Sequence, residues 1–150
     1  MISVVQRVIS GSVCVEGNVY SEIKKGFVIL CGFSKNDTHS DLLWSANKII
    51  NLRVFENREG RFDLSIKDID GEILVVSQFT LLGDVRKGRR PDFTMAMEKE
   101  KAREYYDAFI SILSNLYNPA KIKRGIFQAD MLVSIMNDGP VTVIIDSKLR

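Results

Sequence analysis

Hydrophobic residues in the first third of the chain alternate with polar ones or form short β-branched runs, a pattern typical of β-strands. Breaks at Gly11, Gly17-Asn18 and Lys25-Gly26 separate these runs. The Gly17-Asn18 pair stands between two such runs and predicts a hairpin. The pattern therefore predicts four strands, over residues 4–9, 12–16, 19–23 and 27–33.

Beyond these strands the hydrophobic period changes to that of a helix. Leu42, Leu43, Ala46, Ile49 and Ile50 recur at helical spacing, which predicts an amphipathic helix over residues 40–52. A second helix is predicted over roughly 93–116 and ends before Pro119, because the residue preceding a proline avoids the helical region. Its apolar face comprises Ala102, Tyr105, Tyr106, Phe109, Ile110, Ile112, Leu113 and Leu116.

The remaining apolar runs are short and predict further strands. One covers residues 52–55, and another covers 73–76 and leads into Ser77–Leu81. The tail predicts strands at 121–124, 131–136 and 141–146, with a turn at 137–140 between the last two.

Two helices among about nine strands that follow one another in hairpins, not in βαβ units, predict an α+β fold with a mostly antiparallel sheet. The chain has 150 residues, without a linker, repeat or low-complexity segment, so residues 1–150 are expected to form one domain.

Composition narrows the class of protein. Hydrophobic residues make up 45% of the chain, which excludes a disordered protein. No run approaches the roughly 18–20 apolar residues of a membrane helix. The first residues, 1–7, do not have the pattern of a secretory signal, so we expect a cytoplasmic protein. Cys14 and Cys31 are then expected to be reduced and buried.

Charge and histidine content exclude several functions. A formal net charge of +2 is too balanced for a protein that coats nucleic acid non-specifically. His39 is the single histidine, which excludes multi-histidine metal sites, and any His-dependent hydrolase would have to use it. It stands at a predicted helix start, where Asp37, Thr38 or Ser40 can serve as N-cap, and a solvated histidine is expected there.

Three segments can carry chemistry. The loop at 86–90 holds four cations and is either a phosphate contact or an ordinary solvated loop. Residues 77–80 end a buried strand with two hydroxyls and an amide, and their backbone N–H groups can form an oxyanion site; core packing of Phe79 is the alternative. Gly139-Pro140 is a tight turn by default.

Taken together, these segments resemble a known family. Ser77-Gln78-Phe79-Thr80-Leu81 and Asn137-Asp138-Gly139-Pro140-Val141-Thr142 form a specific pair at this separation. Val5-Gln6-Arg7-Val8, Gly26 to Phe33 and Lys87 to Phe93 occur in the same order as in that family. The chain resembles the D-aminoacyl-tRNA deacylases, also called D-tyrosyl-tRNA deacylases, over essentially its full length.

The resemblance implies a fold and an activity. Members are homodimers with a barrel-like β fold, and they hydrolyse the ester between a D-amino acid and the 3′-terminal adenosine of tRNA. Glycyl-tRNA cleavage is also expected. Neither a cofactor nor a metal is implied, the partner is tRNA and not DNA, and the RNA's own 2′-OH assists catalysis.

The resemblance also assigns roles to residues. Gly139 and Pro140 become a Gly–cis-Pro motif that enters the partner subunit's active site and rejects L-amino acids by steric clash. Ser77, Gln78, Phe79 and Thr80 line the catalytic pocket, where N–H groups near Phe79 and Thr80 stabilise the oxyanion. The residues expected to bind tRNA are Arg86, Lys87, Arg89, Arg90, Phe127 and Met131.

Two positions depart from the family pattern. Gln128 stands where a second glycine is common, and Leu82 stands where an aromatic residue is frequent. Two other functions stay open: a non-catalytic tRNA- or RNA-binding module of the same fold, and a conventional hydrolase that uses His39 with Cys31 or Ser40.

Overall fold

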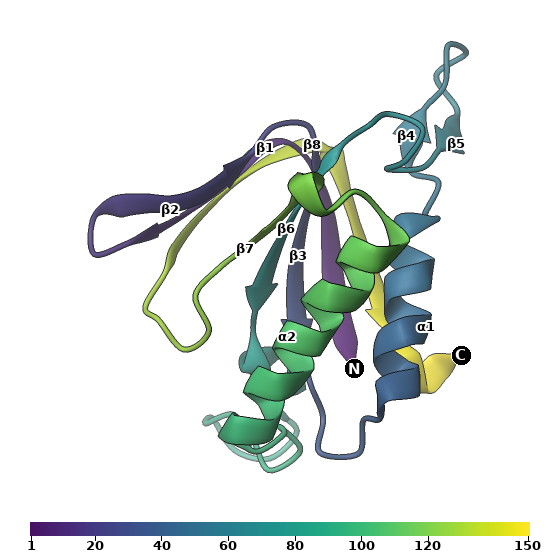
Figure 1. Ribbon diagram of the computed structural model, residues 1–150. Coiled ribbons are helices and arrows are strands. Elements are labelled where there is room, and N and C mark those ends of the chain that lie inside the picture. Colours follow the sequence, from purple (N-terminus) through teal and green to yellow (C-terminus); the bar gives the residue numbers. More distant parts are fainter.

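The computed structural model describes residues 1–150, in which one curved sheet carries two long helices side by side on one face (Figure 1). The helices are α1 (His39–Ile50) and α2 (Lys99–Leu116). The strands are β1 (Ile2–Val15), β2 (Asn18–Ile23), β3 (Gly26–Gly32), β4 (Phe55–Glu56), β5 (Phe62–Leu64), β6 (Glu72–Ser77), β7 (Ile122–Arg124) and β8 (Leu132–Asp146). Three short 3₁₀ turns are η1 (Phe79–Leu82), η2 (Pro119–Lys121) and η3 (Ser147–Leu149).

The long strand β1 organises the sheet. Its first half, residues 2–8, pairs antiparallel with β3, and its second half, residues 11–15, pairs antiparallel with β2. Strand β8 runs antiparallel along both halves. Beyond β3, the strands β6 and β7 are added in parallel, which gives the order β2-β1-β3-β6-β7.

The two ends of this order approach each other. The Ser21 hydroxyl of β2 donates a hydrogen bond to the carbonyl oxygen of Arg124 on β7, at 2.9 Å. The sheet is therefore a nearly closed barrel, and the predicted α+β class with a mostly antiparallel, barrel-like sheet and two main helices is confirmed.

The expectation that no βαβ units occur is wrong. α1 lies between the parallel strands β3 and β6, and α2 lies between the parallel strands β6 and β7. A parallel pair needs a crossover of this kind. The near-continuous apolar runs of β3 and β6 are typical of such buried parallel strands, and the prediction of hairpins did not take them into account. Eight strands are present, one fewer than the pattern predicted.

Two predicted interruptions are absent, because β1 and β8 are continuous. Gly11 lies inside β1, where a Cβ would come within 2.5 Å of Val28 Cγ2, so this glycine permits close packing and does not end the strand. Residues 137–140 lie within β8, where its pairing with β1 is irregular near Arg7. The predicted turn is therefore a bulge inside a continuous strand.

The helix α2 was predicted to start at about residue 93, but residues 93–98 are not helical. Met97 N–H donates to Phe33 O at 2.9 Å, and Lys35 N–H donates to Met95 O at 3.1 Å. These bonds satisfy the backbone outside a helix, so α2 begins only at Lys99.

The central strands β3 and β6 are buried on both faces. Phe27, Ile29 and Cys31 of β3 face the helices and join the larger core, while Val28 faces the barrel interior and a smaller core. Cys31 is buried as expected, but Cys14 is only half-buried, because it points away from the buried Val13. Neither α1 nor α2 is long and apolar enough to cross a membrane.

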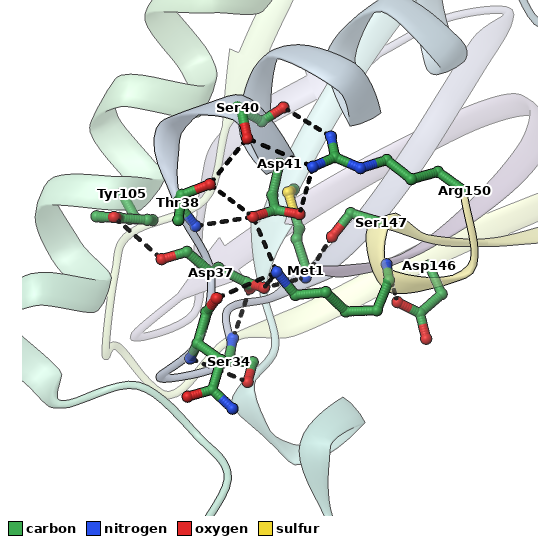
Figure 2. A network of polar contacts seen from close by, with 12 residues as sticks. Met1, Ser34, Asp37, Thr38, Ser40, Asp41, Tyr105, Asp146, Ser147 and Arg150 are labelled. Carbon is green, nitrogen blue, oxygen red and sulfur yellow. Dashed lines mark hydrogen bonds and ion pairs between the residues drawn. The ribbon is translucent and has the colours of Figure 1, made fainter.

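A buried polar network joins the start of α1 to both ends of the chain (Figure 2). The Met1 ammonium contacts Asp37 Oδ1 at 2.6 Å and Ser147 Oγ at 2.8 Å, and all three groups are buried. Thr38, one of the three predicted N-cap residues, is the N-cap of α1. Its N–H donates to Asp41 at 2.8 Å. Lys148 Nζ bonds the same carboxylate at 2.9 Å.

Candidate active site

The end of β6 turns directly into the 3₁₀ turn η1. Gln78 N–H donates to Cys31 O at 2.7 Å and so continues the β3 ladder for one residue. The turn then starts at Phe79, so the first N–H groups, those of Phe79 and Thr80, have no acceptor within it and donate to no other backbone carbonyl. Two adjacent N–H donors are therefore free at this position.

The side chains of Gln78 and Thr80 contact each other. The Gln78 amide nitrogen donates to the Thr80 hydroxyl oxygen, so the amide orients that hydroxyl. No basic side chain hydrogen-bonds Thr80. The single histidine, His39, is exposed and stacks on Tyr105 with ring centroids 5.1 Å apart.

A pocket of about 570 Å³ opens beside this turn. Ser77, Gln78 and Phe79 form one wall, and Phe79 is 58% exposed, so it is not a core residue. The segment before β8 also lines the pocket, through Phe127, Gln128, Ala129, Asp130 and Met131. The other lining residues come from the end of β3 and the residue after it, from β6 and β8, and from α2 and the residues before it: Cys31, Gly32, Phe33, Val76, Val133, Ala96, Met97, Lys99 and Ala102.

Tyr106 of α2 fixes the segment that carries Phe127. Its hydroxyl donates to Val75 O at 2.8 Å and lies 3.2 Å from Gly125 O. Its ring lies 5.8 Å from that of Phe127. Burial raises the pKa of Tyr106, so this hydroxyl stays neutral and keeps its proton for these contacts. Burial likewise raises the pKa of Cys31, so the thiol at the pocket wall is not a nucleophile.

The pocket therefore brings together seven of the residues that the sequence singled out, and Thr80 is not among its lining residues. The seven are Cys31, Ser77, Gln78, Phe79, Phe127, Gln128 and Met131. Sequence reasoning missed Lys99 and Ala102, because no motif distinguishes the first turn of α2. Leu82, one of the two departures from the family pattern, lies close to Gly32 beneath the turn, since a Cβ on Gly32 would meet Leu82 Cδ2 at 2.5 Å.

Gly139 and Pro140 lie elsewhere. They are exposed, the peptide bond between them is cis, and neither lines the pocket of their own chain. The motif lies beside Arg7, which pairs with Phe27 near the start of β3, whereas the pocket lies at the end of β3. One chain alone does not bring the motif and the pocket together.

Arg7 holds the backbone next to this motif. Its side chain is 6% exposed, and Nε donates to Asp138 O at 3.2 Å while a terminal nitrogen donates to Val54 O at 2.7 Å. Sequence reasoning missed this role. The alternation of β1 could have indicated it, because Arg7 points to the same face of the strand as Ser3 and Val5, and all three are buried.

The basic loop lies outside the pocket and is not uniformly free. Arg86 forms a bidentate contact with Asp84, with nitrogen–oxygen distances from 2.6 to 3.0 Å. Hydrogen bonding from Arg86 lowers the pKa of Asp84 to about 2, so this pair stays ionised. Lys87, Arg89 and Arg90 are exposed and form no ion pair. The structure contains no group of three His, Cys, Asp or Glu side chains that could hold a metal ion.

Comparisons with known proteins show which family the chain resembles. The family described as "D-Tyr-tRNA(Tyr) deacylase" matches residues 4–146. A protein of Thermoanaerobacter sp. (strain X514) named D-aminoacyl-tRNA deacylase is 55% identical over 148 residues, which cover 99% of this chain and 98% of that protein. A protein of Clostridium beijerinckii with the same name is 54% identical over 150 residues, with the same coverage.

Solved structures share the fold. One, titled "c-Myc DNA Unwinding Element Binding Protein", superposes with a TM-score of 0.94 at 46% identity and covers 97% of this chain and 98% of that chain. Another, titled as a probable eukaryotic D-amino acid tRNA deacylase, has a TM-score of 0.82 at 17% identity and covers 96% of this chain and 97% of that one. At that identity the second likeness concerns the fold alone.

Proposed function

The chain belongs to the D-Tyr-tRNA(Tyr) deacylase family, and from that membership we propose that residues 1–150 act in the cytoplasm as one D-aminoacyl-tRNA deacylase domain. The protein hydrolyses the ester between a D-amino acid and the terminal ribose of tRNA and releases free tRNA and the D-amino acid. Glycyl-tRNA is a second substrate, because glycine has no side chain to be rejected.

One observation carries this proposal. The free N–H groups of Phe79 and Thr80 are adjacent in the chain, and Phe79 lines the pocket. When water adds to an ester carbonyl, negative charge develops on its oxygen, and two fixed donors stabilise that charge. Loss of one such donor typically costs about 10²–10³-fold in kcat. The turn η1 provides this arrangement with backbone alone.

The chemistry needs no side-chain nucleophile. Water forms a bond to the ester carbon, the bond from carbon to the ribose oxygen breaks, and a proton passes to that leaving oxygen. The 2′-OH of the RNA assists this proton transfer, which is consistent with a turn where no base contacts Thr80. Gln78 positions the substrate. An aminoacyl ester is already activated, so orientation and oxyanion stabilisation suffice.

The choice of D over L comes from the Gly139-Pro140 motif of a second copy. In a homodimer, the exposed motif of one subunit enters the pocket of its partner, where its carbonyl oxygens hold the α-amino group of the substrate. An L side chain then points into the backbone, whereas a D side chain or a hydrogen does not. The separation of motif and pocket within one chain supports this cross-subunit site.

Exposed apolar side chains supply a surface for the second copy. Leu132 and Ile144 of β8 are 71% and 70% exposed, and Met136 and Ile9 on the paired strands β8 and β1 are also exposed. These residues are spread along the length of β8 and the paired part of β1, and exposed apolar side chains along a strand are a surface that a second copy can cover. They flank the strand segment that holds Gly139 and Pro140.

The tRNA is bound at two places. Phe127 and Met131 at the pocket wall contact the terminal adenosine, and the basic loop contacts the phosphate backbone. Within that loop, Lys87, Arg89 and Arg90 are free for phosphate, whereas Arg86 is bound to Asp84 and serves mainly to shape the loop.

The test is deacylation of D-Tyr-tRNA, L-Tyr-tRNA and Gly-tRNA by purified protein, followed by release of the amino acid. We expect cleavage of the D-tyrosyl and glycyl esters and not of the L-tyrosyl ester. A single-stranded DNA with the sequence of the tRNA acceptor end serves as competitor, and it is expected not to inhibit. Binding of tRNA without release from any substrate would instead establish a non-catalytic RNA-binding module.

A further inference from the structure

We propose that Arg103 on α2 binds the phosphate that joins the terminal nucleoside of the RNA to the preceding nucleotide, and that Gln128 holds the guanidinium in place for this contact. The inference rests on the proposed function and adds a substrate contact to it, at a residue that no sequence motif marks.

The guanidinium of Arg103 is fixed at the rim of the pocket. Its central carbon lies 4.9 Å from the centroid of the Phe127 ring, and a terminal nitrogen donates to Gln128 Oε1 at 3.1 Å. Phe127 and Gln128 both line the pocket, so the two contacts place the charge beside its opening. An exposed arginine without such contacts would sample many rotamers.

The charge of this guanidinium is not neutralised. Arg103 forms no ion pair, and its one polar partner is the neutral amide of Gln128. Since a guanidinium has five N–H donors, most of them stay free for an anion. Arg124, which also stacks on an aromatic ring, differs in this respect, because it pairs with Asp107 at 2.8 Å.

A second unpaired cation lies on the same face of α2. Lys99 precedes Arg103 by one helical turn, lines the pocket and forms no ion pair. Asp130 also lines the pocket, but it is beyond ion-pair distance of both cations. The rim near α2 therefore presents two cations that no carboxylate of this chain neutralises.

The backbone conformation of Gln128 supports a positioning role for its side chain. Its φ angle is +67°, in the left-handed region that glycine adopts without cost and other residues rarely adopt. A residue with a Cβ is unfavourable there, and its amide is the group that holds Arg103. Gln128, which stands where the family commonly has glycine, is therefore a positioning residue for the Arg103 guanidinium.

The chemistry of the pocket fits a nucleotide. Phe127 and Met131 offer an apolar wall to a planar base, and the phosphate attached to such a nucleoside must leave the pocket at its rim. A planar guanidinium is suited to a phosphate because two N–H groups can bond two oxygens at once. Arg103 is the fixed guanidinium at that position.

The experiment compares adenosine 5′-monophosphate with adenosine as inhibitors of D-Tyr-tRNA deacylation. The variants are Arg103→Gln and Gln128→Gly, and Arg58→Gln, in the exposed β4–β5 turn, is the matched charge control. Arg103→Gln should raise the inhibition constant of the monophosphate about tenfold and that of adenosine less than about twofold, the scale of one charge-assisted contact. Gln128→Gly should raise the inhibition constant of the monophosphate about threefold. The control Arg58→Gln should change neither inhibition constant.

A structural role of Arg103 would give a different result. Equal changes for both inhibitors, or no change for either, would overturn the proposal. If the wild-type protein does not cleave D-Tyr-tRNA, the proposed function fails, and the same two ligands are then compared by calorimetry. Monophosphate binding that depends on Arg103 would still support the phosphate contact, and equal or absent binding of the two ligands would refute it.

Discussion

Arg7 Nε donates a hydrogen bond to the carbonyl oxygen of Asp138, the residue before Gly139, at 3.2 Å. The same nitrogen lies 3.2 Å from the Asp138 carboxylate, and another nitrogen bonds Val54 O at 2.7 Å. A buried guanidinium on β1 thus ties the exposed motif on β8 to the chain segment before β4. The motif lies in a strand that pairs with β1 on both sides of it, and Arg7 adds a side-chain contact at the residue just before it.

Replacement of Arg7 by glutamine should release the motif. The change removes two hydrogen bonds from a buried side chain, so the free energy of unfolding should fall by about 1–3 kcal/mol. Discrimination between D-Tyr-tRNA and L-Tyr-tRNA should fall as well. Urea denaturation and the ratio of the two deacylation rates measure these effects. Arg61→Gln is the control, because Arg61 is exposed, and unaltered selectivity in Arg7→Gln would contradict a positioning role.

A methyl group on Gly139 should damage the same site directly. The φ angle of Gly139 is +118°, and an added Cβ would lie 2.9 Å from Val141 Cγ2 and 3.1 Å from an Arg7 terminal nitrogen. Gly139→Ala should therefore reduce D-Tyr-tRNA cleavage or its selectivity over L-Tyr-tRNA by at least about tenfold, the equivalent of 1.4 kcal/mol.

Gly17→Ala provides a matched control for that change. Gly17 also has a positive φ angle, +80°, but nothing lies within 4 Å of an added Cβ. It should lower stability by about 1 kcal/mol through backbone strain and leave selectivity unchanged. If both alanine variants lose selectivity alike, the effect is general strain and not a property of the motif.

The sequence predicted the elements better than their connections. Alternation in β1 and the helical spacing of Leu42, Ala46 and Ile49 identify strands and helices, because burial on one face imposes the period. Strand direction and continuity are tertiary properties. Gly11 looks like a break until Val28 is known to pack against it. The near-continuous apolar runs of β3 and β6 are typical of parallel strands buried on both faces, but they do not say which strand is the partner.

The site was predictable where a motif encodes it. Ser77 to Phe79 and the 127–131 segment line one pocket, and their roles in catalysis and tRNA binding stay predictions. Arg103 and Lys99 were not found, because their importance comes from what lies across the fold. An arginine on an amphipathic helix is usually a solvated charge, and what distinguishes Arg103 is its contact with Phe127 and Gln128 together with the absence of an ion pair.

Thr80→Ala tests whether the turn needs a hydroxyl. Thr80 is exposed and accepts a hydrogen bond from Gln78, and no base contacts it. The substitution keeps the backbone N–H groups, so kcat for D-Tyr-tRNA should fall by less than about tenfold. A loss of more than about 10³-fold, the scale for removal of a catalytic group, would make Thr80 the nucleophile.

His39→Ala tests the conventional hydrolase. His39 lies on α1, contacts Tyr105 and does not line the pocket, and burial makes the thiol of Cys31, which does line it, a poor nucleophile. Deacylation of D-Tyr-tRNA should be unchanged within about twofold. A collapse of activity with an intact fold, verified by circular dichroism, would restore the histidine mechanism.

Stability in acid should depend on Asp41. Burial alone would raise the pKa of this carboxyl, but hydrogen bonds from Lys148 and Thr38 outweigh it and hold the pKa well below its usual range. A carboxyl whose pKa is lower in the folded state stabilises the fold above its unfolded pKa, about 3.9. This stabilisation is lost progressively as the pH falls below that value.

Asp41→Asn should therefore lower the free energy of unfolding at pH 7 by about 1–2 kcal/mol, a moderate value because Lys148 is partly exposed and screened by salt. The difference from wild type should shrink as the pH falls from 5 to 2. In this range the Asp41 carboxyl of the unfolded wild-type chain takes up a proton, while the folded carboxyl, with its lowered pKa, stays largely ionised, so protonation favours unfolding of the wild type only. Urea denaturation at several pH values measures this, and Glu104→Gln, an exposed site on α2, is the control. A difference that stays constant down to pH 2 would mean that packing, and not the charge of Asp41, stabilises the start of α1.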